Sequence, residues 1–179
     1  MRSLAELDAH LDHIRAAPRD AGVVELIVRR PEKEARDVVE EARLDETVGL
    51  VGDNWSTRGS KRTPDGSAHP QQQLTLMMTR ALAAIAERER WPLAGDQFLV
   101  DFDLSQASLP VGTKLALGEA IIEISELPHL GCDKFTTRFG SDATKWVNNG
   151  EGRELRLRGV NARVVRGGIV RRGDSLRRV

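Results

Sequence analysis

Short strand-like segments separated by turn signals fill the second half of this chain, and they restrict its fold more than any other feature. The segments are QFLVDFD, TKLALG, AIIEISEL, RELRLRG, NARVVRG and GIVRRGD. Turn-forming sequences lie between them, at LPVGT, Asn149-Gly150 and Gly167-Gly168. Many short strands with few helices are typical of a β-barrel-like domain. We therefore expect an α+β, mainly β fold, a barrel with a few flanking helices.

The first part of the chain adds helices to this pattern. Ser3 and Glu6 predict a capping box, and leucines follow at helical spacing, so we expect one amphipathic helix over residues 3–17. Strands are predicted at VVELIVRRP and QQLTLMM, and over residues 36–45, where weak alternation competes with a charge content that favours helix. Two further helices are predicted at TRALAAIAERERW, closed by Pro92, and at SDATKWVN, with Ser141 as N-cap.

The length of the chain, 179 residues, suits one domain with a small appendage. We divide it into an N-terminal helix, 1–19, and a domain over 20–179. Gly, Pro and Ser predict a loop at WSTRGSKRTPDGSAHP, and loops of this length are usually functional or mobile.

Charge and cysteine content limit the possible partners. The formal net charge is zero, so no overall field attracts nucleic acid or a membrane. The single cysteine cannot form an internal disulfide, which fits a reducing compartment. The segment MRSLAELDAHLDHIR has acids where a signal peptide needs an apolar run, and no apolar run is long enough to span a bilayer. We expect a cytoplasmic protein with no nucleic-acid or membrane partner.

Charge is nevertheless uneven, because residues 151–179 contain nine arginines and three acids. Guanidinium groups match phosphate well, so an anion is a possible partner of this region. A solvated sheet face is the simpler explanation, and we favour it. RNA would prefer aromatic platforms, and this region contains no aromatic residue. The arginines concerned are Arg153, Arg156, Arg158, Arg163 and Arg166.

The segment PHLGCDKFTTRFG, residues 128–140, has the highest density of reactive side chains. It contains Cys132, and Lys134, Arg138 and a protonated His129 would favour a thiolate there. A thiolate is a nucleophile and a soft-metal ligand. The alternative is that Cys132 is a small buried apolar residue, as free cysteines often are. His129 and Cys132 also form an H-x-x-C pair, but zinc needs further ligands that the sequence does not place nearby.

Several strings, in order, resemble the MOSC domain, the molybdenum cofactor sulfurase C-terminal family, in its small stand-alone bacterial form. They are RRP, GLVGDN, QQLTLM, AGDQFLVDFDLSQASLPVGTKLALGEAIIEISELPHLGCDKFTTRFG and RLRGVNARVVRGGIVRRGD. The resemblance covers roughly residues 20–175. Its most specific parts are the C-x-K-[FL]-x-x-R-F string and the terminal ARVV-x-GG-x-V-x-x-GD string.

The resemblance implies a MOSC-type β-barrel with flanking helices. It also implies that Cys132 is the protein ligand to molybdenum in a molybdenum cofactor (molybdopterin). Relatives with this ligand reduce small N-hydroxylated compounds, and this chain has no motif for an electron carrier, so a separate electron-donating reductase is expected. The cofactor's phosphate calls for cations. The residues assigned to cofactor binding are Lys134, Arg138, His129, Arg58, Lys61 and Arg163.

Two other functions remain open at this stage. In the sulfurase context the same cysteine is proposed to carry a persulfide, so Cys132 would pass sulfur to metal–sulfur cofactor assembly without binding a metal. A non-catalytic module that stores or escorts the cofactor is the third possibility.

No GxxxxGK[ST], GxGxxG or G-x-S-x-G string is present. ATP-dependent, dinucleotide-dependent and serine-hydrolase chemistry therefore have no support from the sequence.

Overall fold

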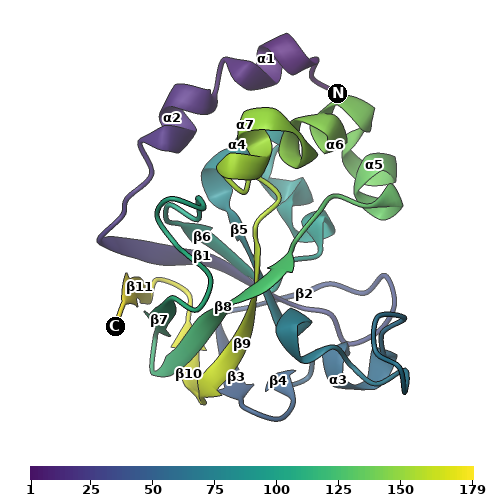
Figure 1. The fold of residues 1–179 in the computed structure, drawn as a ribbon, viewed down its shortest axis with the longest axis vertical. Coiled ribbons are helices and arrows are strands. Elements are labelled where there is room, and N and C mark those ends of the chain that lie inside the picture. Colours follow the sequence, from purple (N-terminus) through teal and green to yellow (C-terminus); the bar gives the residue numbers. More distant parts are fainter.

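The computed structural model describes all 179 residues, and seven of its strands close into a β-barrel (Figure 1). The strands follow one another in the order β11-β7-β8-β9-β5-β6-β1, and pairing of β1 with β11 closes the ring. The mainly β, barrel fold predicted from the sequence is therefore confirmed. The barrel strands are β1 (Ala21–Arg29), β5 (Leu74–Met78), β6 (Phe98–Asp101), β7 (Lys114–Leu117), β8 (Ala120–Pro128), β9 (Val160–Arg166) and β11 (Ser175–Arg178).

Strand β1 has three neighbours because it runs past the edge of the barrel. Its first residues pair with β11, its middle with β6, and its last residues with β2 (Asp37–Val39). A small second sheet contains β3 (Glu41–Asp45), β4 (Gly49–Leu50) and β10 (Gly168–Arg171). The strand predicted over residues 36–45 is confirmed, but it is divided into β2 and β3, which belong to different sheets.

The only parallel pair in the barrel, β5 with β6, requires a crossover. The crossover consists of α4 (Thr79–Ile85) and the 3-10 segment η2 (Arg88–Ala94). The helix predicted at TRALAAIAERERW is confirmed as α4, but its predicted end at Pro92 was wrong. The α-helix already ends at Ile85, because Ala86 is extended, and Pro92 lies inside η2.

Three consecutive helices are inserted between the paired strands β8 and β9: α5 (Asp133–Phe139), α6 (Ser141–Asn148) and α7 (Gly150–Glu154). The predicted helix at SDATKWVN is confirmed as α6, although Gly140, not Ser141, is its N-cap. The strand predicted at RELRLRG was wrong. Its first residues end α7, and a turn follows in which Arg156 has a left-handed backbone with φ of 50°.

The N-terminal segment consists of two short helices, α1 (Leu4–Asp8) and α2 (Leu11–Arg15), where one helix over residues 3–17 was predicted. The predicted capping box is present, since the Ser3 amide donates to the Glu6 carboxylate at 2.7 Å. Leu7 and Ile14 are buried in the same core as the barrel. The indole of Trp146 on α6 also donates to Asp8 at 2.9 Å, and Figure 1 shows these helices grouped at one end of the molecule.

The predicted loop of residues 55–70 begins with the short helix α3 (Trp55–Arg58) and runs into the 3-10 turn η1 (Pro70–Gln72) at its end. None of the helices in the structure combines the length and the apolarity needed to cross a membrane.

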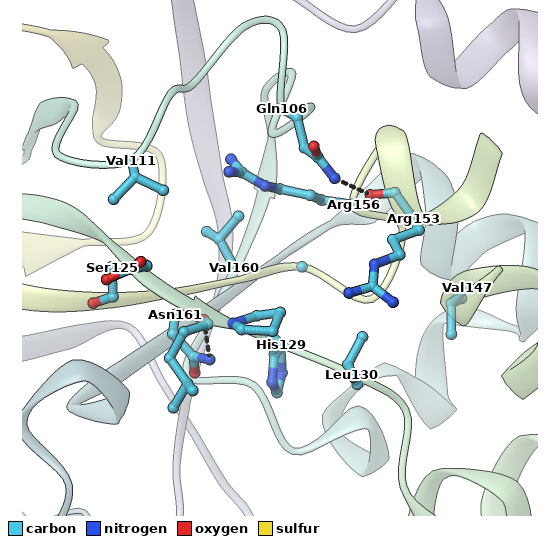
Figure 2. Close-up of a pocket in the computed structure, with 14 residues that line it drawn as sticks. Gln106, Val111, Ser125, His129, Leu130, Val147, Arg153, Arg156, Val160 and Asn161 are labelled. Atoms are coloured by element: carbon cyan, nitrogen blue, oxygen red, sulfur yellow. Dashed lines mark hydrogen bonds between the residues drawn. The ribbon is translucent and has the colours of Figure 1, made fainter. Parts of the chain in front are cut away.

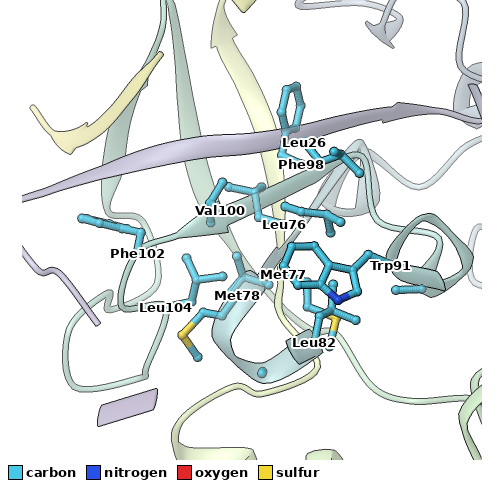
Figure 3. Close-up of a cluster of buried hydrophobic side chains, with 14 of the residues drawn as sticks. Leu26, Leu76, Met77, Met78, Leu82, Trp91, Phe98, Val100, Phe102 and Leu104 are labelled. Atoms are coloured by element: carbon cyan, nitrogen blue, oxygen red, sulfur yellow. The ribbon is translucent and has the colours of Figure 1, made fainter. Parts of the chain in front are cut away.

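Apolar side chains from the crossover and the adjoining strands form a continuous core (Figure 3). Met77 and Leu76 on β5 and Phe98 on β6 are fully buried, and Trp91 of η2 packs among them. Burying one such side chain stabilises the fold by ~1.5–3 kcal/mol. This core gives the rim of the barrel a rigid support, on which the candidate site is built.

Candidate functional site

Cys132 lies at the N-cap position of α5, after the short turn that follows strand β8, and its side chain is exposed. The interpretation of Cys132 as a buried apolar residue was therefore wrong. Its backbone is held from α6: the Gly131 amide donates to the Asn148 side chain at 2.7 Å, and the Asn148 amide donates back to the Gly131 carbonyl at 2.9 Å. This pair of bonds fixes the peptide directly before the thiol.

A cavity of about 350 Å³ opens beside Cys132. The structure brings five of the predicted site residues into its wall: Arg58, His129, Cys132, Lys134 and Arg138. They come from α3, from the turn after β8 and from α5, and Figure 1 shows α3 and α5 on the same side of the barrel.

Two predicted site residues lie outside this cavity. Lys61 lines a separate shallow hollow beside Arg58. Arg163, on β9, pairs with Glu123 of β8 at 2.9 Å on the outside of the barrel, and its side chain is 53% exposed. The structure therefore gives Arg163 a role in joining two strands.

Four cations of the wall were not assigned to the site from the sequence: Arg30, Lys33, Arg36 and Arg158. Arg158 was interpreted as one of the solvated arginines of a sheet, but it follows α7 and its side chain is only 6% exposed. No signal in RELRLRG distinguishes it from its neighbours. Arg30 could have been identified from the sequence, because it lies in RRP, one of the strings that carry the resemblance. In the structure it contacts Asp53, which lies in another of these strings, GLVGDN.

Arg30 and Asp53 form a buried pair at the base of the cavity. The Arg30 guanidinium donates through Nε and Nη2 to the two Asp53 oxygens, each at 2.8 Å, and its Nη1 donates to the Gly95 carbonyl at 2.8 Å. Asp53 also accepts from the Trp55 amide at 3.1 Å, which orients the start of α3. A two-point arginine–carboxylate contact is both strong and directional. The pair therefore fixes Arg58, at the end of α3, relative to β1.

A second buried group joins Asp96, Arg158 and His129. Asp96 is fully buried and accepts from Arg158 Nη1 at 2.6 Å, while its other oxygen contacts His129 Nε2 at 2.9 Å. Burial alone would raise the pKa of Asp96, but the charge of Arg158 and the hydrogen bonds from His129 and Arg158 outweigh it and lower that pKa. Burial, followed by the charge of Arg158, lowers the pKa of His129 despite the nearby Asp96. His129 is therefore neutral at neutral pH.

Glu34 places a carboxylate at the mouth of the cavity. It accepts from Lys134 at 2.8 Å and also pairs with Arg138, so the loop between β1 and β2 is tied to α5. The hydrogen bond from Lys134 and the charge of Arg138 lower the pKa of Glu34 to about 2. The Glu34 backbone has a φ of 67°, a conformation that costs a non-glycine residue ~1–2 kcal/mol.

Arg36 and Arg58 face the same cavity without any ion pair. Burial lowers the pKa of both, and the charge of Arg30 lowers both further; for Arg36 the charge of Arg138 contributes before it. Cations that repel one another in a partly desolvated wall are unfavourable unless an anion compensates them. The cavity is therefore suited to an anionic ligand.

Four buried polar atoms around the cavity have no hydrogen-bond partner in the protein. Two are donors, Nε of Arg36 and Nε of Arg158, and two are acceptors, Oδ1 of Asn54 and Oδ1 of Asn161. Buried polar groups in native proteins are normally paired, so such a cluster indicates a missing hydrogen-bonding ligand or water. A ligand that both donates and accepts would satisfy this set.

Comparison with solved structures identifies the type of barrel. The YuaD protein of Bacillus subtilis superimposes with a TM-score of 0.61 at 17% identity, covering 87% of this chain and 94% of that one. YiiM of Geobacillus stearothermophilus gives a TM-score of 0.61 at 14% identity, covering 88% and 75%. YiiM of Escherichia coli gives 0.56 at 19%, covering 88% and 69%.

The fold is MOSC-like. YuaD and YiiM are both MOSC-family proteins, and their agreement with this chain extends over nearly its whole length. At these identities the likeness concerns the MOSC-like fold alone. No family model matches the chain, and no curated protein matches it at the level of sequence.

Proposed function

We propose that the Cys132 cavity of this MOSC-like protein binds the molybdenum cofactor, with the Cys132 thiolate as the protein ligand to the metal. The observation that carries the proposal is the combination, in one cavity, of an exposed thiol, two unpaired arginines and four unpartnered polar atoms. Thiolate sulfur suits molybdenum as a soft ligand, and guanidinium groups suit the cofactor's phosphate.

The residues present fit the rest of the cofactor as well. A pterin carries ring N–H donors together with ring nitrogen and carbonyl acceptors. The unpartnered carboxamide oxygens of Asn54 and Asn161 would accept from the ring, and the unpartnered Nε groups of Arg36 and Arg158 would donate to it. Arg58, without an ion pair in the protein, is then available for the phosphate.

We further propose that the protein reduces small N-hydroxylated compounds. When bound, the cofactor supplies the metal centre for a two-electron reduction of an N–O bond, which also consumes two protons and releases water. A separate reductase supplies the electrons. Neutral His129 donates its Nε2–H to the Asp96 carboxylate, which leaves Nδ1 to accept a hydrogen bond from the substrate.

A sulfur carrier is the second candidate, because the thiol of Cys132 is exposed enough to react with a partner. A carrier of this kind needs no cation-lined cavity, so Arg36 and Arg58 would have no part in it. Because the carrier function leaves the cation-lined cavity unexplained, we rank it below cofactor binding.

Molybdenum content tests the proposal directly. We would purify the protein gently from a cofactor-producing host, and measure molybdenum by mass spectrometry and pterin by fluorescence after release. Wild type should contain near-stoichiometric metal and pterin, Cys132→Ala no metal, and Arg36→Gln combined with Arg58→Gln little of either. Arg43→Gln, which removes an exposed cation of β3 that does not line the cavity, is the matched control and should resemble wild type.

The proposal is wrong if wild type carries no metal even after incubation with free cofactor. An intact mass with one extra sulfur that is lost on reduction, and on Cys132→Ala, would then establish the carrier instead.

A further inference from the structure

A second cavity, of about 330 Å³, lies on the other side of a wall that it shares with the Cys132 cavity. His129 and Asn161 belong to that wall and line both cavities. Figure 2 shows the second cavity where the end of β8 meets the start of β9, with Arg153 and Arg156 entering from α7 and the turn after it.

An irregularity in the barrel creates this space. Ile124 pairs with Ala162 and Pro128 pairs with Val160, so residues 125–127 of β8 bulge opposite the single residue Asn161. The Asn161 side chain donates through Nδ2 to the Leu127 carbonyl at 2.9 Å, in place of a missing backbone ladder bond. Bulges of this kind are common next to functional sites, where they redirect side chains. Here the bulge leaves the Ser125 hydroxyl buried, at the cavity and without a partner.

Two cations in this cavity lack any ion pair. The Arg153 side chain makes no hydrogen bond or ion pair within the protein, and only its carbonyl is engaged, by Gln106 at 3.0 Å (Figure 2). Arg156 is partly buried, which lowers its pKa, and it donates only to carbonyl oxygens, with the Leu109 carbonyl at 2.6 Å. The single acid in the lining, Glu126, is exposed and pairs with neither. The Arg153 guanidinium is therefore free to bind an external anion, and the Arg156 guanidinium, which donates to carbonyl oxygens only through Nη1, keeps its Nε and Nη2 donors for the same anion.

Apolar side chains form one part of the wall. Val111 and Leu130 are 54% and 40% exposed, and both are among the few large apolar residues that the protein leaves at its surface. Val147 and Val160 lie deeper in the same lining. A ligand with an apolar body would cover this surface, which is unfavourable in contact with water.

We propose that this second cavity binds a small carboxylic acid, with its carboxylate on Arg153 and Arg156 and its apolar body against Val111, Leu130 and Val160. A planar carboxylate matches the guanidinium fork, and the Ser125 hydroxyl supplies one more donor. The volume is at the lower end of ligand sites and limits the occupant to a small molecule. This proposal does not depend on metal binding at Cys132.

Titration calorimetry with benzoate as the probe, and benzamide as its uncharged counterpart of the same shape, tests the site. Benzoate should bind saturably, and benzamide at least about tenfold more weakly, because it lacks the charge. Arg153→Gln should weaken benzoate by about tenfold without affecting the fold, since this side chain has no partner to lose. Val111→Asp, at an exposed position, should weaken it as well.

Two control variants separate this site from its neighbour. Arg36→Gln removes a cation from the Cys132 cavity, and Arg43→Gln removes one from β3, so both should bind benzoate as wild type does. The proposal is overturned if benzoate does not saturate, if Arg153→Gln binds it normally, or if Arg36→Gln weakens it as much as Arg153→Gln.

Discussion

The carboxylate of Glu34 forms ion pairs with two of the cations at the mouth of the Cys132 cavity, Lys134 and Arg138. An incoming anion must compete with it for these groups. We therefore expect Glu34→Gln to bind phosphate more tightly than wild type, by several-fold up to about tenfold. Calorimetry with inorganic phosphate measures this difference, and Glu32→Gln, in the same loop but without an ion pair, is the matched control.

The acidity of Glu34 predicts how this effect depends on pH. The pKa of Glu34 is lowered to about 2, so its pairing is fully present above its ordinary value of 4.5 and is lost only as pH falls toward 2. The ratio of sulfate affinities between Glu34→Gln and wild type, measured with sulfate because its charge is constant over this range, should then be the same at about pH 5 and about pH 8. A ratio that shrinks at pH 5 would mean that Glu34 is not held as an ion in the folded protein.

His129 should make the stability of the fold depend on pH, and in a higher pH range than most carboxylates do. Burial and Arg158 lower its pKa from the ordinary 6.5, so below that pH the unfolded chain binds a proton that the folded chain resists. Stability should therefore fall as pH falls below about 6.5. Urea titrations of wild type and His129→Gln at about pH 5 and pH 7 measure this effect, which the variant should largely lose. Equal slopes in both proteins would contradict the neutral, buried histidine.

At the scale of elements, the start of β9 approaches β5 so closely that only glycine fits. A Cβ at Gly159 would lie 2.0 Å from the Leu76 carbonyl oxygen, and its φ is 100°. Gly173 has a similar φ of 89° with nothing within 4 Å, so it is the matched control. We expect Gly173→Ala to cost ~1–2 kcal/mol from the backbone alone, and Gly159→Ala a further ~1–3 kcal/mol from the clash. Urea unfolding measures both, and equal losses would show that the two strands can separate without cost.

The sequence predicted elements well where the repeat of apolar residues was regular and poorly where it was short. Strands β1, β5, β8 and β9 were predicted, because apolar runs bounded by turn or helix signals specify them, with many β-branched residues in β1, β8 and β9. The alternation of Leu155 and Leu157 suggested a strand, but tertiary packing turned these residues into the end of a helix and a turn. Local sequence does not record such packing.

The same limit applies to the candidate site. Cys132, Lys134 and Arg138 were found because they share one short string, whereas Arg36 and Arg158 lie far apart in the chain and meet only in the folded barrel. Arg163 shows the reverse case, since a matching string placed it in the site and the structure placed it between two strands.

For the whole molecule, closure of the ring depends on one short strand. β11 pairs with both β7 and β1, and Leu176 on it is fully buried. Leu176→Ala should cost ~2–5 kcal/mol, while Arg177→Ala, on the exposed face of the same strand, should cost little. Hydrogen exchange should show β1 and β7 losing protection together in Leu176→Ala. Loss confined to β11 would mean that the barrel does not unfold as a unit.

The pairing of Ala21 with Arg177 also has a consequence for the time course of synthesis. A nascent chain that has already formed β1, β7 and β6 still lacks the strand that joins the first two, so it exposes two open sheet edges. Contacts of such large sequence separation form late and slowly. The vulnerable period for this protein is therefore the interval just before β11 leaves the ribosome, when intermolecular strand pairing competes with closure of the ring.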